Sequence, residues 1–185
     1  MLLSIDPGLN NCGVAVSDIG DRYKVLETYN IKNSRKFNEA EKTLEAFYNA
    51  RVVKIAFIEA TIRGFLEKYK DIDEVAIEAP FYHASTPMAY SSLLEVISAI
   101  RYKILIPMGL KITMVEPLLV KKLFITDKLT KGMNGKEYMK EFLKKRVASG
   151  DIVYEGDIDS LTEHEIDAIG VGFTSKLLEK GKQEW

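Results

Sequence analysis

The feature that most constrains this chain is a pair of apolar runs that each end in a carboxylate. Residues 2–6 (LLSID) end in Asp6 ahead of a Pro-Gly turn, and residues 74–78 (EVAIE) end in Glu78 two residues before a proline. An acid in this position caps a tight turn, stands in solvent or meets a cation, because burying a lone carboxylate is costly. The rest of the sequence has to decide between these interpretations.

The order of apolar runs and turns predicts a mixed sheet. Five segments have the short, apolar, turn-bounded pattern of strands: residues 2–6, 13–16, 21–31, 74–78 and 109–117. The first three are joined by short turns and predict an antiparallel meander. The last two each follow a helical pattern, which favours parallel pairing. We therefore expect an α/β fold with five strands, three antiparallel and two parallel, flanked by helices, with Asp6 and Glu78 at one end of the sheet.

Helical periodicity accounts for most of the remaining sequence. From 38 to 70, apolar residues recur every three or four positions, which predicts one helix of about 50 Å that bends near Gly64 or projects. Residues 88–106 are apolar nearly all round, so we expect this helix to be buried on more than one side, the second being a dimer interface. Two basic helices are expected at 117–125 and 136–148.

The last predicted helix, residues 160–180, carries a second set of polar side chains. Ser160 and Glu163 have the spacing of a capping box. The apolar stripe of this helix comprises Ile166, Ile169, Phe173 and Leu177. His164 and Asp167 lie on another face, with Glu163 one turn before Asp167. These side chains either line a solvated helix surface or complete a cluster of three carboxylates and one imidazole at the sheet end.

Composition narrows the class of protein. The 185 residues, 46% of them hydrophobic, are expected to form one domain over 1–185 with a full core. No apolar run approaches the roughly 18 residues of a membrane helix, and the first residues lack a signal-peptide pattern, which favours a cytoplasmic protein. The single cysteine, Cys12, excludes an internal disulfide and a multi-cysteine zinc site and fits a buried strand position.

Basic residues are concentrated in one part of the chain. Between Pro117 and Gly150, nine lysines and arginines face three acids, whereas the whole chain has a net charge of −1. Such a run is more often a solvated helix face than a binding site. The asymmetry nevertheless suits a protein that contacts phosphates on one side.

The motifs resemble those of a known family, the RuvC-type Holliday-junction resolvases of the RNase H-like and retroviral-integrase superfamily. SIDPGLNNCGVAV is similar to that family's opening strand-turn-strand, VAIEAPF to its second motif, and EHEIDAIGVGF to its last. VEPLLVKKL and NGKEYM resemble its lysine-bearing segments. The motifs are collinear and cover most of the chain. A longer helix before Glu78, a wider spacing from Glu78 to Asp167 and a less basic charge would suit a phage-encoded relative.

The resemblance implies an RNase H-like nuclease that resolves Holliday junctions by symmetric nicking. Carboxylate oxygens select Mg²⁺ or Mn²⁺, and two such ions about 3.5–4 Å apart activate a water and stabilise the leaving 3′ oxygen. Asp6 would bridge both ions, and Glu78 and Asp167 would each hold one. His164 would bind metal or orient the water, with Glu163 as the alternative fourth group. The product would be a nick with a 5′ phosphate and a 3′ hydroxyl.

Contacts to four-way or branched DNA are expected in two places. Phe81 and Tyr82 either stack on a base unpaired at the junction centre or begin a helix as core aromatics. Lysines that would neutralise backbone phosphates are Lys121, Lys122, Lys128, Lys131 and Lys136. Two symmetric nicks require two active sites, which implies a homodimer in the cytoplasm of a bacterial or phage-infected cell. The sequence identifies no helicase partner.

Other functions compete with this one. An actin-like or sugar-kinase-like ATPase also starts with an Asp and a Gly after a strand, but nothing after residue 100 supplies its second phosphate loop. A non-catalytic junction-binding module would keep the fold without the chemistry, although all three acids are present. Within the enzyme class, a ribosomal-RNA-processing nuclease and a broader nuclease of forks and flaps remain open.

Overall fold

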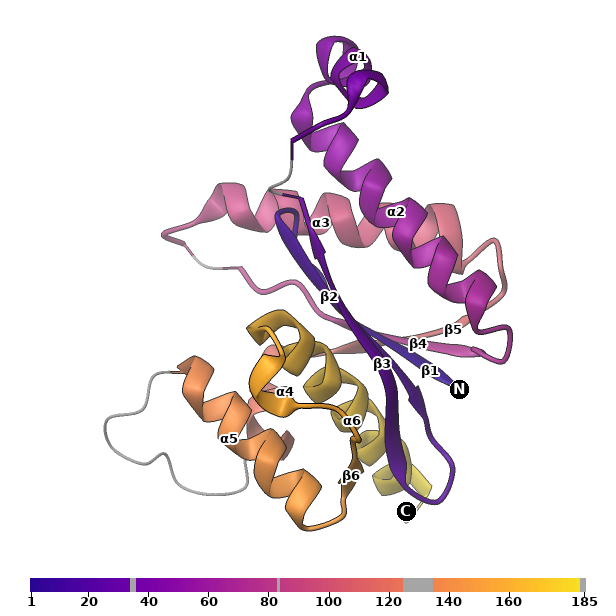
Figure 1. The fold of residues 1–185 in the computed structure, drawn as a ribbon, viewed down its shortest axis with the longest axis vertical. Coiled ribbons are helices and arrows are strands. Elements are labelled where there is room, and N and C mark those ends of the chain that lie inside the picture. The colour runs from indigo at the N-terminus through magenta and orange to yellow at the C-terminus, as the bar shows by residue number, and fades with distance from the viewer. Residues whose placement is uncertain (34–35, 83, 125–134, 184–185) are drawn as a thin grey trace.

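A six-stranded mixed sheet forms the centre of the molecule (Figure 1). The computed structural model describes residues 1–33, 36–82, 84–124 and 135–183, with only the backbone described for residues 124, 135, 136, 182 and 183. The strands are β1 (Leu2–Asp6), β2 (Asn11–Asp18), β3 (Tyr23–Lys32), β4 (Glu74–Glu78), β5 (Lys111–Val115) and β6 (Ile152–Val153). Their order in the sheet is β5-β4-β1-β2-β3-β6.

The pairing of the five longer strands confirms the predicted sheet. β1, β2 and β3 are antiparallel, whereas β4 runs parallel to β1 and β5 parallel to β4. The sixth strand was not predicted. It consists of two residues that pair in parallel with the start of β3, and a pairing this short depends on where the chain before the last helix is placed, not on local periodicity.

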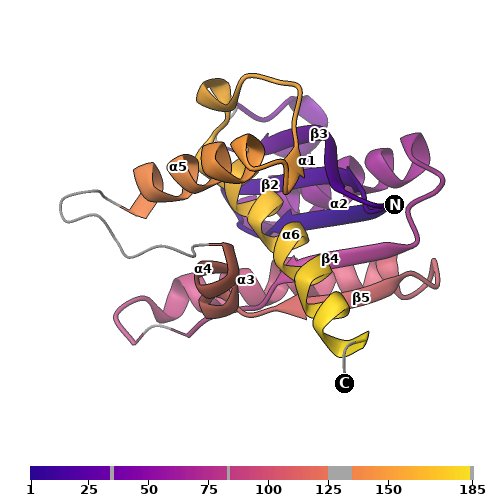
Figure 2. The same ribbon diagram turned by 90° about the horizontal axis from the view of Figure 1, so that it is seen from below.

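Helices cover both faces of the sheet (Figures 1 and 2). On one face lie α2 (Ala50–Lys68) and α3 (Pro87–Ile100), which continues as a π-helical turn over Arg101–Leu105. On the other face lie α4 (Pro117–Phe124), α5 (Gly135–Ala148) and α6 (Glu163–Gln183). A short 3₁₀ turn, Ile158–Ser160, precedes α6. The remaining helix, α1 (Glu39–Tyr48), projects beyond the sheet.

The single long helix predicted over 38–70 is wrong, because the chain breaks at Asn49. This residue has φ +76°, and its side chain accepts a hydrogen bond from the backbone N–H of Arg51, so it ends α1 and caps α2. Gly64, the predicted bend, lies within α2. The apolar stripe is buried only in the second half, at Ile58, Ile62 and Phe65, while α1 has no buried residue.

The predicted start of the last helix is also corrected. Ser160 belongs to the 3₁₀ turn, and the capping box is formed by Thr162 and Glu165. The backbone N–H of Thr162 donates to Glu165 Oε2 at 2.9 Å, and the N–H of Glu165 donates back to the Thr162 hydroxyl at 3.4 Å. Because two residues in this segment have capping-box spacing, local sequence does not distinguish them. The predicted stripe of Ile166, Ile169 and Phe173 is buried.

Side-chain alternation divides the sheet into two hydrophobic cores. In β1, Leu3 and Ile5 join the core under α2 and α3, whereas Leu2 joins the core under α5 and α6. β4 alternates in the same way, with Val75 and Ile77 toward α2. The acids at the two strand ends, at positions 6 and 78, therefore project toward the α6 side.

The helix over residues 88–106 forms largely as predicted. The dimer interface expected on its second side stays a prediction. Several of its apolar side chains are exposed: Met88, Leu94, Tyr102 and Ile106. Among the described residues, no helix combines the length and the hydrophobicity that a membrane span requires.

Candidate active site

Three elements bring the predicted acids to one end of the sheet. β1 and β4 are parallel neighbours in which Ile5 pairs with Ile77, so Asp6 and Glu78, the next residues, end the two strands side by side. Asp6 also pairs with Gly13 of β2, across the antiparallel turn. The first two turns of α6 supply His164 and Asp167 above these strand ends. The expected convergence of these groups at one sheet end is therefore present.

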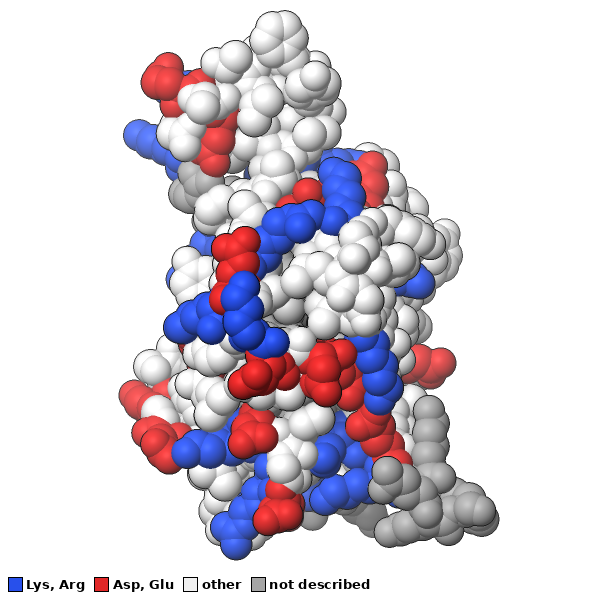
Figure 3. Space-filling model, turned by 90° about the vertical axis from the view of Figure 1, so that its right-hand side faces the viewer, with Lys and Arg blue, Asp and Glu red and all other residues white. Residues whose placement is uncertain are grey.

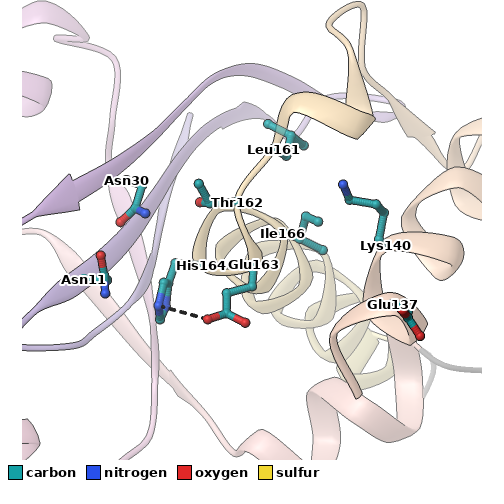
Figure 4. Close-up of a pocket in the computed structure, with 9 residues that line it drawn as sticks. All are labelled: Asn11, Asn30, Glu137, Lys140, Leu161, Thr162, Glu163, His164 and Ile166. Carbon is teal, nitrogen blue, oxygen red and sulfur yellow. Dashed lines mark ion pairs between the residues drawn. The ribbon is translucent and has the colours of Figure 1, made fainter. Parts of the chain in front are cut away.

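Gly13 allows α6 to approach the sheet closely. A Cβ at this position would lie 1.8 Å from the backbone oxygen of His164, a distance that no side chain tolerates. Because Gly13 is the strand partner of Asp6, the same approach brings the imidazole onto the carboxylate: His164 Nδ1 lies 2.8 Å from Asp6 Oδ2. His164 Nε2 lies 3.6 Å from Glu163 Oε1 (Figure 4). The imidazole thus bridges two acids from two elements.

Burial, together with nearby negative charge, raises the pKa values of Asp6, Glu78 and Asp167. Burial raises the pKa of Asp6, and the hydrogen bond and charge of His164 oppose this rise. Burial, followed by the charges of Asp6 and Asp167, raises the pKa of Glu78 to about 8. Burial, followed by the charge of Asp6, raises the pKa of Asp167 to about 7. The hydrogen bond to Asp6 raises the pKa of His164. Several negatively charged groups therefore lie close together at this site, with little positive charge to balance them.

Lys121 is the nearby lysine that partly offsets this crowding. Its positive charge, from α4, lowers the pKa values of both Glu78 and Asp167. Lys121 and Lys122 are both exposed on that helix. Lys136 lies in the first turn of α5, but its side chain is outside the described atoms, and Lys128 and Lys131 lie outside the described residues.

The carboxylate oxygens of this site are of the chemical type that binds hard divalent cations. Clustered carboxylate oxygens are the ligands that Mg²⁺ or Mn²⁺ prefers. A divalent cation would also relieve the excess negative charge that contributes to their raised pKa values. Within the described residues, no three His, Cys, Asp or Glu side chains are arranged to hold one ion. Asp6 Oδ2 instead lies 2.8 Å from His164 Nδ1. Metal binding at Asp6 would replace this contact.

The two aromatic residues after β4 are exposed. Phe81 is 58% and Tyr82 57% accessible, and the Tyr82 ring contacts Tyr90 of α3 edge-on at 5.3 Å between centroids. The alternative interpretation, core aromatics that begin a helix, is excluded by this exposure. Both rings are available to a partner close to Glu78.

Sequence reasoning missed a cavity beside the acids that has both polar and apolar walls. A cavity of about 500 Å³ opens between β2, β3, α5 and the start of α6, and it borders His164 and Glu163 (Figure 4). Asn11 and Asn30 lie on one side of it and Lys140 on the other. Both asparagines occur in strand-like runs, where periodicity predicts only which face they occupy. Their meeting depends on the register in which Gly13 pairs with Asn30.

The opposite end of the sheet has a different surface. Figure 3 shows the side of the molecule on which β1 begins, where acidic and basic side chains are interspersed. One example is Lys111, which pairs with both Glu74 and Glu179. Mixed charges of this kind satisfy one another, in contrast to the crowded carboxylates at the other end.

The fold is RNase H-like and is similar to the folds of solved Holliday-junction resolvases. RuvC of Thermus thermophilus, solved with a Holliday junction substrate, has a TM-score of 0.63 and 16% identity over 97% of this chain and 95% of its own. The yeast mitochondrial Holliday junction resolvase Ydc2 has a TM-score of 0.64 and 10% identity over 100% and 84%. Fowlpox virus resolvase, in complex with junction DNA, has a TM-score of 0.52 and 14% identity over 96% and 99%. Neither a family model nor a curated protein sequence matches the chain.

Proposed function

We propose that this protein is a metal-dependent endonuclease that nicks branched DNA and resolves four-way junctions symmetrically. The observation that carries the proposal is the meeting of Asp6, Glu78 and Asp167 at one end of an RNase H-like sheet, with His164 on Asp6. The likeness of the fold to three resolvases supports the choice of DNA junctions as substrate. Cleavage of forks and flaps is the alternative within the same chemistry.

The metal ligands in this proposal are Asp6, Glu78 and Asp167, with His164 or Glu163 as the fourth group. When bound, two Mg²⁺ or Mn²⁺ ions would supply the charge that activates a water and stabilises the leaving 3′ oxygen of the phosphodiester. The chain itself supplies the crowded carboxylates whose raised pKa values make cation binding favourable. Their mutual repulsion in the free protein also means that substrate phosphate and cation bind best together.

His164 has a positioning function in the free protein. Its Nδ1 holds Asp6 Oδ2 at 2.8 Å, while Nε2 faces Glu163 at 3.6 Å. The imidazole, placed between two carboxylates, holds the side chain of Asp6 in position before ligands arrive. With a cation bound at Asp6, His164 would orient a water or serve as a further ligand.

DNA contacts are assigned to the exposed groups around this cluster. Lys121 and Lys122 of α4 would neutralise phosphates without reading bases, as would Lys128, Lys131 and Lys136. Phe81 and Tyr82 project from the loop after Glu78 and would stack on bases unpaired at the junction centre. A homodimer through the exposed apolar side chains of α3 would present two sites to the two cleaved strands.

The first test is cleavage of an end-labelled synthetic four-way junction beside matched duplex, fork, flap and RNA/DNA hybrid substrates. Each is incubated with Mg²⁺, Mn²⁺ or EDTA, using wild type, Asp6→Asn and, as a control, Asp71→Asn at an exposed position remote from the acids. We expect paired nicks on the junction that need metal, disappear in Asp6→Asn and persist in Asp71→Asn. Nicked products should religate with DNA ligase, which requires a 5′ phosphate and a 3′ hydroxyl.

Other outcomes define the alternatives. Comparable cutting of forks and flaps would widen the substrate class to branched DNA. Preferred cutting of an RNA substrate would indicate an RNA-processing nuclease. Tight junction binding without cutting in either metal would overturn the enzyme proposal and leave a junction-binding module.

A further inference from the structure

The guanidinium group of Arg146, in α5, connects three parts of the chain that are distant in sequence. Its Nη1 donates to Asp151 Oδ2 at 2.8 Å, and its Nη2 donates to the backbone oxygen of Leu123 at 2.9 Å. It also lies 5.3 Å from the ring centroid of Phe173 in α6, a cation–π contact. The side chain is 17% exposed. Arg146 therefore connects the end of α4 to both α5 and α6.

The contact at Leu123 is important because α4 is a short helix. It has eight residues, and an isolated helix of this length is not stable in water. The last carbonyl groups of a helix have no donor within it and carry partial negative charge. Arg146 supplies both a donor and a positive charge at this end. Val120 is buried in the core, but Leu118 is 67% exposed, so α4 has a limited contact with the rest of the protein.

The register of the sheet places α4 beside the acids. Glu78 at the end of β4 pairs with Val115 at the end of β5, and α4 begins two residues later at Pro117. Lys121 lies in the second turn of this helix, and its charge lowers the pKa values of Glu78 and Asp167. The position of α4 thus sets the position of this positive charge.

Pairing with an acid does not by itself explain an arginine at position 146. The Nε of Arg146 is buried and has no hydrogen-bond partner within the described residues, which is unfavourable. A lysine would pair with Asp151 without this additional buried donor. The guanidinium group differs from an ammonium group in its fixed fork of donors, and here one nitrogen contacts Asp151 and another contacts the Leu123 carbonyl. This geometry indicates that the contact to α4 is what requires an arginine.

Arg63 of α2 makes a similar contact on the other face of the sheet. Its Nη2 donates to the backbone oxygen of Lys103 at 2.5 Å, in the π-helical turn after α3. This turn leads to the start of β5 at Lys111, whereas the acids lie at the end of that strand (Figure 1). The two arginines therefore both hold a backbone carbonyl of another element, but only the helix held by Arg146 carries a lysine next to the acids.

We propose that Arg146 is a positioning residue for junction binding and cleavage, which fixes α4 against α5 and α6 so that Lys121 meets a DNA phosphate beside the acids. The inference rests on the proposed nuclease function, in which Lys121 neutralises a phosphate of the bound DNA. Arg146 itself contacts no DNA, because Asp151, Leu123 and Phe173 occupy its guanidinium group. Loss of Arg146 should therefore have the same consequence for DNA binding as loss of Lys121.

Amide hydrogen exchange, followed by NMR in the free protein, tests the structural step. Arg146→Met keeps an unbranched side chain and removes the fork, so exchange at Val120 and Lys121 should become about tenfold faster, as expected for loss of one hydrogen bond from a charged group. Arg146→Lys, which retains the charge, should accelerate exchange at the same residues less, and it provides the test if Arg146→Met does not fold. Arg63→Met is the control and should leave exchange in α4 unchanged. Unchanged exchange in α4 of the folded Arg146 variants would overturn the proposal, whether or not the protein cleaves DNA.

The salt dependence of junction binding tests the step through Lys121. Affinity for a labelled four-way junction is measured in EDTA over a series of KCl concentrations, and each phosphate contact contributes about 0.9 to the slope of log affinity against log salt. Arg146→Met and Lys121→Met should each reduce the slope by about this amount, and the double variant should reduce it no further. Arg63→Met should keep the wild-type slope.

This slope distinguishes positioning from a general loss of stability. A smaller folded fraction lowers the apparent affinity by the same factor at each salt concentration and leaves the slope unchanged. A wild-type slope in Arg146→Met, or a double variant whose slope falls by the sum of the two single effects, would overturn the proposal. Absence of junction binding by wild type would instead overturn the nuclease function, and with it the role of Lys121.

Discussion

The two faces of the sheet are built from different kinds of side chain. Under α2 and α3, the sheet contributes aliphatic residues such as Leu3, Ile5 and Val14, together with the buried thiol of Cys12. On the α6 side, the buried positions include hydroxyl groups, at Ser4 and Ser17 of the sheet and at Thr174 of α6, and Gly13, which the helix approaches closely. Bulky aliphatic side chains fill one face, whereas polar groups and close contacts between backbone atoms characterise the other.

This difference explains where the candidate site lies. Alternation along β1 and β4 points both terminal acids to the face on which α6 lies close to the backbone. A helix that lies near the sheet can place His164 and Asp167 within reach of those acids. We infer that the aliphatic face supplies stability and the α6 face supplies chemistry.

The largest effect is expected from emptying the aliphatic face. Ile62→Ala removes a fully buried side chain of α2 and should lower the free energy of unfolding by about 4 kcal/mol, through lost burial and the cavity left behind. Val52→Ala, at an exposed position of the same helix, should change it by less than about 1 kcal/mol. Urea denaturation measures both values.

Alkylation of Cys12 reports the same face locally. Burial raises the pKa of this thiol to about 12, so it should react slowly in the native protein at pH 8. Ile62→Ala should accelerate the reaction much more than Val52→Ala does. Equal acceleration by both variants would contradict the division into two faces.

The next effect concerns the close approach on the other face. Gly13→Ala should cost about 3 kcal/mol, because the new methyl group would occupy the position of the His164 backbone. Unlike Ile62→Ala, it should also abolish nicking in the fraction that remains folded, since α6 must move away from Asp6. The matched control is Gly64→Ala in α2, where nothing lies within 4 Å of the added atom. Retained nicking in folded Gly13→Ala would show that α6 tolerates displacement.

The parts of the fold that the sequence predicted are those set by local periodicity. Apolar runs bounded by turns located five strands, and the spacing of Ile166, Ile169 and Phe173 located the buried stripe of α6. The break at Asn49 was missed because the apolar spacing continues through it, and only the capping side chain opposes a continuous helix. Asn is a residue type favoured at helix N-caps, so considering Asn49 as the start of a second helix would have raised that alternative.

The site was predictable to the same extent. Acids at strand ends and a polar pair on a helix are local patterns, and parallel pairing then brings them together. The cavity at Asn30 was not predictable, because it depends on a register that includes an irregularity between Val16 and Ser17. A shift of one residue would turn Asn30 to the opposite face.

A smaller effect, of opposite sign, is expected at the acids. Asp167→Asn removes one of the crowded buried charges and should raise the free energy of unfolding of the metal-free protein by about 1 kcal/mol while abolishing nicking. Thermal unfolding in EDTA at pH 8 measures the change, with Asp71→Asn as the exposed control. Adding Mg²⁺ should raise the unfolding temperature of wild type more than that of Asp167→Asn. Destabilisation by Asp167→Asn in EDTA would mean that the carboxyl group makes favourable contacts in the free protein.

The smallest effect is expected where neither face is involved. Phe47 of α1 is 77% exposed, and α1 has no buried residue, so Phe47→Ser should change the free energy of unfolding by no more than about 0.5 kcal/mol. Phe65→Ser, at a buried position of α2, should cost about 4 kcal/mol. Urea denaturation at two protein concentrations tests both variants. A loss above about 1 kcal/mol for Phe47→Ser that grows with concentration would mean that a second copy covers α1 in solution, and the comparison would then extend from two faces to a third.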